Sequence, residues 1–279
     1  MSSAFYELAN RLNRQPLWLE FERYAAAVFA GQPADWATDA HRYADCLSQA
    51  QRLVRSDVVA IAVLDGWLAD PAWRSIAEVS LGEALSQWNE QGLHQRFATD
   101  VLDALFHRMS QPMLVMSLPA PSQVLRRVGR LPPFDFGDLD DVAAALTAVL
   151  RSHSTRAFGA LALRCDAPEG LTEDEREACQ PLLKSARYYG WGTALRLDAV
   201  PEGGALSAQG FDAVLLGHWS EEALDACGVE QAAGGLAGSY WREPARALRR
   251  CALRYGEIPP DAVPEKVLEH LQVLHGLRP

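Results

Sequence analysis

The chain has 279 residues, of which 49% are hydrophobic, and its 26 basic against 36 acidic residues give a formal net charge of −10. A chain of this length can bury a large core, and α/β barrels of this size commonly form one domain, so we expect a single domain over residues 1–279. The acidic balance, with no basic stretch of the kind that follows a phosphate backbone, argues against binding to nucleic acid.

The sequence also lacks the features that would direct it to a membrane or an oxidising compartment. The longest apolar run, Val58 to Leu64, is too short to cross a bilayer, and the first residues place no basic segment before an apolar one. The five cysteines are scattered and include no C-x-x-C pair, which is typical of reduced thiols. We therefore expect a cytoplasmic protein with no membrane partner.

The first sixty residues show the spacing of amphipathic helices. Apolar residues recur three and four positions apart from Phe5 to Leu12, from Trp18 to Phe29 and from Ala40 to Val54. A continuous β-branched run then lies between two acids, Asp57 and Asp65, as expected for a strand that is covered on both faces. We predict extra N-terminal helices followed by a buried parallel strand.

Strands and helices alternate along the rest of the chain. Beyond the Val58–Leu64 strand, the predicted strands are Met113–Leu118, Phe158–Arg164, Thr193–Leu197 and Asp212–Leu216. The predicted helices are Leu139–Arg151, Thr172–Tyr189, Glu243–Arg254 and Pro264–His275. Thr172 followed by Glu175 is a capping-box pattern, and Gly190 is placed to end that helix. This order indicates βαβ units and a parallel sheet.

A doubly wound open sheet and a closed barrel share this alternation, and periodicity alone does not separate them. The turn after the first predicted strand reads Asp65-Gly66-Trp67-Leu68, and it lacks the glycine-rich phosphate loop of dinucleotide-binding folds. We therefore predict an α/β fold of the (β/α)8 TIM barrel type.

Polar residues just past the predicted strands are the candidate functional residues, because the active site of a parallel barrel lies at the carboxyl ends of its strands. They are Asp65, Ser117, Arg164, Asp166, Arg196, Asp198 and His218. Such a set offers arginines that hold an anionic substrate and an acid that transfers a proton. We expect Asp65 and His218 to be catalytic, and Ser117, Arg164, Arg196 and Asp198 to bind substrate.

Three assignments compete with structural roles. Asp65 follows a buried strand, where a carboxyl takes a perturbed pKa, but an aspartate there could equally cap the next helix. Arg23 could form a forked pair with a substrate carboxylate, or an ion pair with Glu20 one turn away. His218 could be a general acid or base, or a structural histidine before a helix that Ser220 caps.

The arginines and the early tryptophan also keep two interpretations. Arg164 and Arg196 could face the substrate, or they could pair locally with Asp166 and Asp198. Trp18 could line a pocket, although a tryptophan of this kind more often fills the core.

Several segments carry a resemblance to a known family. Residues 16–24, from Pro-Leu-Trp to Arg-Tyr, residues 56–65, residues 118–121 and residues 255–267 resemble the uroporphyrinogen decarboxylase superfamily. Its members are (β/α)8 barrels that include cofactor-free decarboxylases and zinc-dependent methyltransferases, and they often pair as homodimers. The resemblance implies that the 16–24 segment binds substrate through Trp18, Arg23 and Tyr24, and that the strand ending in Asp65 supplies the catalytic aspartate.

The chain also departs from the pattern of this family. The decarboxylases' Met-Arg-Gln-Ala-Gly-Arg segment is two residues shorter here and lacks its first arginine, and Glu20 and Glu22 add negative charge. The family's late histidine is Tyr255. A tetrapyrrole with many carboxylates would be repelled by these acids, so we do not expect uroporphyrinogen as the substrate. The methyltransferases' His-x-Cys is replaced by Leu197-Asp198-Ala199.

We therefore expect a cofactor-independent, decarboxylase-like lyase that acts on a small anionic metabolite bearing a carboxylate. One alternative is a zinc-dependent methyl or alkyl transferase of the same superfamily, although His218, Cys227 and the distant Cys251 do not form a zinc motif and we expect no metal. Another alternative is a non-catalytic barrel that binds a ligand or a partner enzyme. A homodimer is possible on the resemblance alone.

Overall fold

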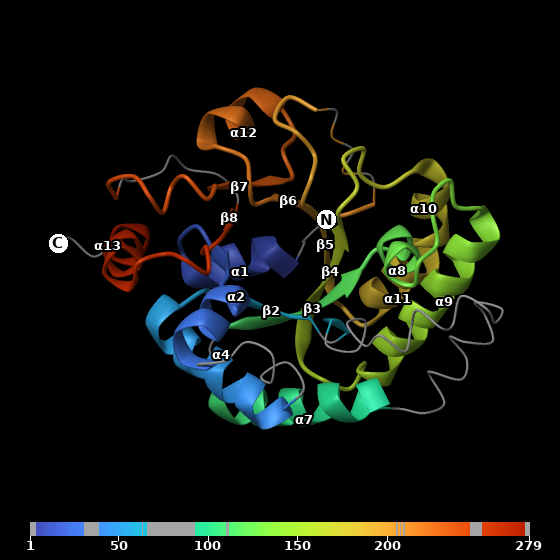
Figure 1. The fold of residues 1–279 in the computed structure, drawn as a ribbon, viewed down its shortest axis with the longest axis horizontal. Helices are drawn as coiled ribbons and strands as arrows, with labels where there is room; N and C mark the ends of the chain where they lie inside the picture. Colours follow the sequence, from blue (N-terminus) through green and yellow to red (C-terminus); the bar gives the residue numbers. More distant parts are fainter. Residues whose placement is uncertain are drawn as a thin grey trace.

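The computed structural model describes residues 4–30, 39–62, 64–65, 93–109, 112–204, 206, 208, 210–245 and 253–276. Within them, parallel strands form a closed barrel with helices around it (Figure 1). In chain order the strands are β1 (Leu17–Glu20), β2 (Val58–Ile61), β3 (Met113–Pro119), β4 (Phe158–Cys165), β5 (Gly192–Leu197), β6 (Ala213–Leu216), β7 (Ala232–Leu236) and β8 (Arg254–Glu257). The fold is a (β/α)8 barrel of the TIM type.

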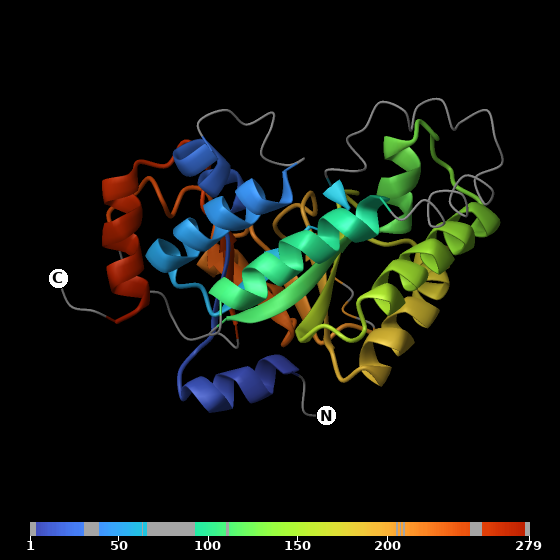
Figure 2. The same cartoon turned by 90° about the horizontal axis from the view of Figure 1, so that it is seen from below.

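The helices cover the outside of the barrel and one of its ends. They are α1 (Ala4–Leu12), α2 (Glu22–Ala25), η1 (Ala26–Ala30), α4 (Ala40–Val54), α7 (Leu93–Arg108), α8 (Pro121–Arg127), α9 (Phe136–Ser152), α10 (Glu173–Ala178), α11 (Gln180–Tyr188), α12 (Glu221–Cys227) and α13 (Pro264–Leu274). Figure 2 shows α1 beneath the barrel, at the opposite end from α2 and α8. We call the end where the strands begin the base, and the end where they finish the mouth. None of the helices in the described ranges is both long enough and apolar enough to cross a membrane.

The first and last strands close the ring. Residues 17–20 of β1 pair in register with residues 254–257 of β8. On the other side of β8, a Cβ atom at Gly256 would overlap the carbonyl oxygen of Leu236 in β7. Only glycine fits such a close approach of two strands, so the position of β8 beside β7 depends on this residue.

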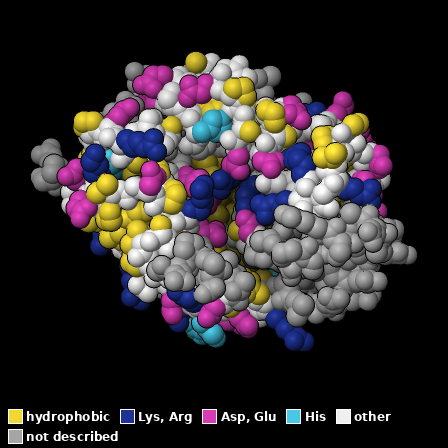
Figure 3. All heavy atoms as spheres, in the orientation of Figure 1, with side chains coloured by type: hydrophobic (Ala, Val, Ile, Leu, Met, Phe, Trp, Pro, Cys, Tyr) yellow, Lys and Arg dark blue, Asp and Glu magenta, His cyan; other side chains and the backbone are white. Residues whose placement is uncertain are grey.

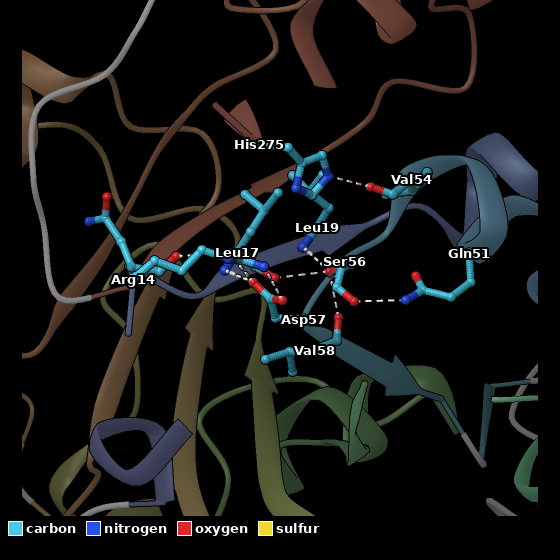
Figure 4. Close-up of polar contacts among 10 residues, drawn as sticks. Arg14, Leu17, Leu19, Gln51, Val54, Ser56, Asp57, Val58 and His275 are labelled. Carbon is cyan, nitrogen blue, oxygen red and sulfur yellow. Dashed lines mark hydrogen bonds and ion pairs between the residues drawn. The ribbon is translucent and has the colours of Figure 1, made fainter. Parts of the chain in front are cut away.

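β1 and β2 share one ladder pair, Trp18 with Val58, and side chains supply further contacts between them (Figure 4). The Ser56 hydroxyl accepts a hydrogen bond from the backbone N–H of Leu19 at 2.9 Å. The same oxygen lies 2.7 Å from the carbonyl oxygen of Val58, to which it can donate. The Ser56 side chain thus provides hydrogen bonds between β1 and β2, which share only one backbone ladder pair in the described residues.

Asp57 makes the second side-chain connection at the same joint. Its carboxylate accepts a hydrogen bond from the backbone N–H of Leu17 at 2.8 Å and forms a forked ion pair with Arg14 at 2.6 and 2.7 Å (Figure 4). The start of β1 is therefore held to β2 by charge-assisted hydrogen bonds, which are stronger than neutral ones.

Small and apolar side chains fill the inside of the barrel. Alternate residues of a strand point to opposite faces, so one set from each strand meets at the axis. The inner cluster consists of Phe5, Leu8, Trp18, Val58, Ala60, Val115, Ala160, Ala162, Ala194, Ala213, Leu215, Ala233, Leu253 and Tyr255. Trp18 is fully buried, and its ring centroid lies 5.8 Å from that of Phe5 and 5.7 Å from that of Tyr255. Alanines leave room for this large side chain at the axis.

The five predicted strands from Val58 onward are confirmed as strands, but three further strands were not predicted. The expected helix Trp18–Phe29 is wrong at its start, because Leu17–Glu20 is β1 and helix begins at Glu22. The strand that was predicted as the first is therefore the second. The expected helix Glu243–Arg254 is also wrong at its ends, since residues 243–245 are not helical and Arg254 begins β8. Residues 246–252 of that helix, and residues 66–68 after Asp65, lie outside the described residues.

The expected helix ends are confirmed. The Thr172 hydroxyl accepts a hydrogen bond from the backbone N–H of Glu175 at 3.2 Å, and Gly190 has a φ of 76°, a left-handed conformation that favours glycine. The helix between them is divided at Cys179 into α10 and α11.

Candidate functional site

Charged and polar side chains lie on the inner face at the mouth of the barrel. Glu20, Ser117, Arg164, Arg196 and Glu257 each come two residues after a member of the inner cluster, so each continues its strand's inward-facing set. The strand register places the two glutamates side by side on β1 and β8, and the two arginines side by side on β4 and β5. Figure 3 shows basic and acidic side chains gathered around a hollow near the centre of the face seen in Figure 1.

Asp65 and Arg164 form a forked ion pair at the mouth. Arg164 Nη1 donates to Asp65 Oδ2 at 2.6 Å, and Nη2 donates to Oδ1. Burial raises the pKa of Asp65, but Arg164, together with Arg127 and Arg196, outweighs burial and holds that pKa below its ordinary value. The carboxylate of Asp65 is therefore ionised at neutral pH, with both oxygens directed to one guanidinium.

Glu22 is a second acid at the mouth, with the opposite character. It is the first residue of α2 and is half-buried. Burial, followed by the negative charge of Asp65, raises its pKa to about 8, while Arg164 and a hydrogen bond with Tyr43 act in the other direction. Glu22 therefore keeps its proton at neutral pH. A general acid must be protonated at the working pH, and the charge of Asp65 helps to keep Glu22 in that form.

Arg196 has side-chain nitrogens that can take a ligand. Its Nε donates to Asp198 Oδ1 at 2.6 Å. Its Nη1 lies 3.8 Å from Glu20 Oε1, and its Nη2 lies 3.7 Å from Glu257 Oε2. Both distances exceed hydrogen-bonding range. The two nitrogens therefore attract Glu20 and Glu257 electrostatically but form no hydrogen bond with them, and they can donate to a ligand. Burial raises the pKa of Glu20, while the charges of Arg196 and Arg164 act in the other direction.

A cavity of about 570 Å³ opens beside Arg196. Its lining includes Arg23, Arg196, Asp198, His218, Tyr255 and Glu257. A hollow of this volume accommodates a small metabolite. Burial raises the pKa of Tyr255 well above its ordinary value, against the opposing charge of Arg196, so its hydroxyl is a neutral hydrogen-bond donor.

Arg23 and Asp65, expected to bind substrate and to be catalytic, lie at the same end of the barrel but do not both line this cavity. Arg23 lines it, with 72% of its side chain exposed and Nη1 at 3.4 Å from Glu257 rather than near Glu20. Asp65 is not one of the cavity's described lining residues. It interacts electrostatically with Arg196, which does line the cavity.

The remaining polar candidates are placed as follows. His218 is exposed at the cavity, and its Nε2 contacts the carbonyl oxygen of Val200. Asp198 pairs with Arg196, which was the alternative to a role of Arg196 in binding substrate. Asp166 pairs with Arg126 instead of Arg164.

Trp18, Tyr24 and Ser117 are buried away from the cavity. Trp18 fills the barrel interior, and Ser117 is buried on β3. Tyr24 lies in the core between strands and helices, where burial and the nearby charge of Glu265 in α13 raise its pKa. Trp18 and Tyr24 therefore contribute to packing in this structure, and neither reaches the polar wall that Arg196 forms.

Reasoning from the sequence missed Tyr43 and Glu257 as site residues, and treated Glu20 and Glu22 only as added negative charge. The signal was present in the alternation of β1, because Glu20 is two residues after the inward-facing Trp18. This alternation applies only to a strand, so the prediction of a helix over residues 18–29 concealed the inward direction of Glu20. For Tyr43, on α4, the sequence gives no signal.

No protein-family model and no curated protein matches this chain. Within the described part of the chain, no three His, Cys, Asp or Glu side chains are grouped as metal ligands, and Cys251 lies outside that part. The geometry of the mouth is therefore the basis for a functional assignment.

Proposed function

We propose that this barrel is a lyase of decarboxylase type, which binds a small carboxylate-bearing metabolite at Arg196 and completes its reaction with a proton from the mouth. The observation that carries the proposal is the side-by-side placement of a ligand-accessible guanidinium and a set of acids on the inner face of one barrel end. Charge-assisted, forked hydrogen bonds from arginine are well suited to hold a carboxylate.

Glu22 and Asp65 have different roles in the proposed reaction. Loss of CO2 from a carboxylate leaves a carbanion, and a protonated acid must then supply a proton to carbon. Glu22 carries that proton at neutral pH. Asp65 keeps its charge through Arg164, and its charge in turn favours the protonated form of Glu22. In this proposal Asp65 retains a role at the reacting centre, and Glu22 is the proton donor.

The resemblance to the uroporphyrinogen decarboxylase superfamily supports the same proposal. The family's aspartate corresponds to Asp65 and its segment ending in Arg-Tyr corresponds to residues 16–24. In this chain that segment is β1 with the start of α2, so it delivers Glu20, Glu22 and Arg23 to the mouth. We propose that the chain is a divergent member of this superfamily whose substrate is smaller than a tetrapyrrole.

The proposal is tested by screening small mono-, di- and tricarboxylic acids for thermal stabilisation, because any ligand of the folded state raises the melting temperature. Acids that stabilise the protein are then assayed for CO2 release. Glu22→Gln should abolish release while leaving stabilisation intact, and Arg196→Gln should abolish both. Glu177→Gln, which changes an exposed acid on α10, is the matched control. Retained CO2 release in a folded Glu22→Gln protein would refute the role of Glu22.

A non-catalytic barrel that binds a ligand is the second candidate. It is favoured by the Asp65–Arg164 pair, in which both carboxylate oxygens are already engaged. The same screen separates the two candidates, since a binding protein is stabilised by its acid without consuming it. Zinc analysis of the purified protein tests the methyltransferase alternative.

A further inference from the structure

A second cavity lies at the base of the barrel, at the opposite end from the candidate site. It has a volume of about 760 Å³ and is formed where α4 and α7 end and where α1 leads into β1. We call it the basal cavity and define it by Leu12, Arg14, Arg52, Arg55, Arg108 and Met109 among its lining residues. Figure 4 shows one wall, where Arg14 meets Asp57 and where His275 approaches the end of α4.

The basal cavity is strongly basic although the chain as a whole carries a charge of −10. Four arginines line it, and the acid among its described lining residues is Asp57. That carboxylate is already bound by Arg14 and by the backbone N–H of Leu17. Arg108 pairs with Asp45 at 2.6 Å. Asp57 and Asp45 are thus each paired with an arginine that lines the cavity.

Arg52 and Arg55 differ from the other two arginines. Within the described ranges neither has a carboxylate at ion-pairing distance, and both are exposed to the cavity side of α4. Arg55 also has a φ of 52°, in the left-handed region, at the end of α4. Glycine or asparagine adopts this conformation at less cost than arginine. The chain thus places a guanidinium at a position where its backbone conformation favours another residue.

We propose that the basal cavity binds a small phosphate-bearing molecule, with its phosphate groups held by Arg52 and Arg55. Two unpaired guanidinium groups match the fork geometry by which arginine binds phosphate oxygens. The volume exceeds what a single phosphate needs and is in the range of sites for small organic ligands. Leu12, Met109 and Pro112 supply an apolar part of the lining, against which the organic portion of the ligand can pack.

The competing explanation is that these arginines only offset the negative ends of helices. Arg52 lies in the last turn of α4 and Arg108 in the last turn of α7, where positive side chains are favourable without any ligand. Arg151 provides the matched control, because it lies exposed in the last turn of α9 and is not part of the cavity lining.

The test is calorimetric titration of the full chain with pyrophosphate, ADP and uncharged adenosine at about 0.15 M salt, where long-range attraction is screened. Pyrophosphate and ADP should bind, and adenosine should not. The Arg52→Ala/Arg55→Gly double variant should weaken both affinities by about tenfold or more, while Arg151→Ala should change them by less than about twofold. Arg55→Gly relieves the left-handed backbone, and the single variant Arg52→Ala gives a second measurement if the double variant does not fold.

Three results would overturn the proposal. They are absence of binding of either anion to the folded wild-type chain, undiminished binding in the folded double variant, and an equal loss in Arg151→Ala. Undiminished binding in the double variant would show that the anion binds elsewhere. An equal loss in Arg151→Ala would show that the anion responds only to the overall charge of the protein.

Discussion

Replacing Glu22 by glutamine should remove the contribution of this residue to the pH dependence of stability. In the folded protein Glu22 keeps its proton up to a pKa of about 8, whereas a free glutamate releases it near 4.5. Between these two values the folded state binds more protons than the unfolded state, so this residue makes the free energy of unfolding fall as the pH rises. Glutamine is similar in shape and carries no proton to lose.

The size of the effect follows from the two pKa values. Each pH unit of separation corresponds to about 1.4 kcal/mol, so the interval from 4.5 to about 8 sets a ceiling of about 5 kcal/mol. Water and the neighbouring charges relax around an ionised side chain, and we expect about 2–3 kcal/mol to be observed. Near pH 5 the variant and the wild type should be equally stable, and above pH 8 the variant should be the more stable by this amount.

Urea denaturation followed by tryptophan fluorescence, at about pH 5.5, 7 and 8.5, measures the difference directly. Subtracting the variant from the wild type cancels the contributions of titrating groups that do not interact with Glu22. Glu177→Gln is again the control, because it removes an exposed acid and should leave the pH dependence of the wild type unchanged. Parallel stability profiles for Glu22→Gln and wild type across this range would refute the electrostatic description of the mouth.

Three further substitutions test other parts of the structure. Asp65→Asn should lower the free energy of unfolding by about 2–4 kcal/mol at neutral pH, because it leaves the Arg164 guanidinium buried without its charge partner. Since the pKa of Asp65 is lowered in the fold, this loss should shrink as the pH falls below about 4, and a cost that does not change in acid would contradict the ion pair. Gly256→Ala should cost about 2 kcal/mol or more, measured by thermal melting, because its methyl group meets the backbone of β7; an unchanged melting temperature would show that β8 can shift freely. Asp57→Asn should cost about 1–3 kcal/mol in urea denaturation through the lost pair with Arg14, and a variant as stable as wild type would show that β1 is held by its ladder alone.

The central strands of the barrel could be predicted from the sequence because their residues are apolar on both faces. Met113–Pro119 and Phe158–Cys165 are buried along nearly their whole length, and such runs between helices indicate a parallel sheet. Helix ends were predictable for a similar local reason, since the Thr172 cap and Gly190 act within one turn.

The strands that close the barrel could not be predicted, because their sequences carry polar or very small residues. β7 contains Gly234 and Gly235, and β8 consists of Arg-Tyr-Gly-Glu. Neither has the β-branched composition that marks a strand. Their pairing depends on neighbours that are distant in sequence, such as β1 with β8.

Only those site residues that lie on recognisable strands could be predicted. Arg164, Arg196 and Asp198 end strands that were recognised, whereas Glu20 and Glu257 end strands that were not. The pairing of Asp65 with Arg164 joins residues 99 positions apart, and only the closed ring brings them together.

Side-chain hydrogen bonds from Ser56 and Asp57 hold β1 against β2 at two points. A strand of this length spans about 13 Å. Asp57 holds its start through the backbone N–H of Leu17, and Ser56 holds it again at Leu19, one residue before Glu20. Glu20 and Glu22 thus lie on, or directly after, a short strand that two side chains hold in place. Ser56 and Asp57 thus support the segment that carries Glu20 and Glu22, although neither lines the cavity beside Arg196.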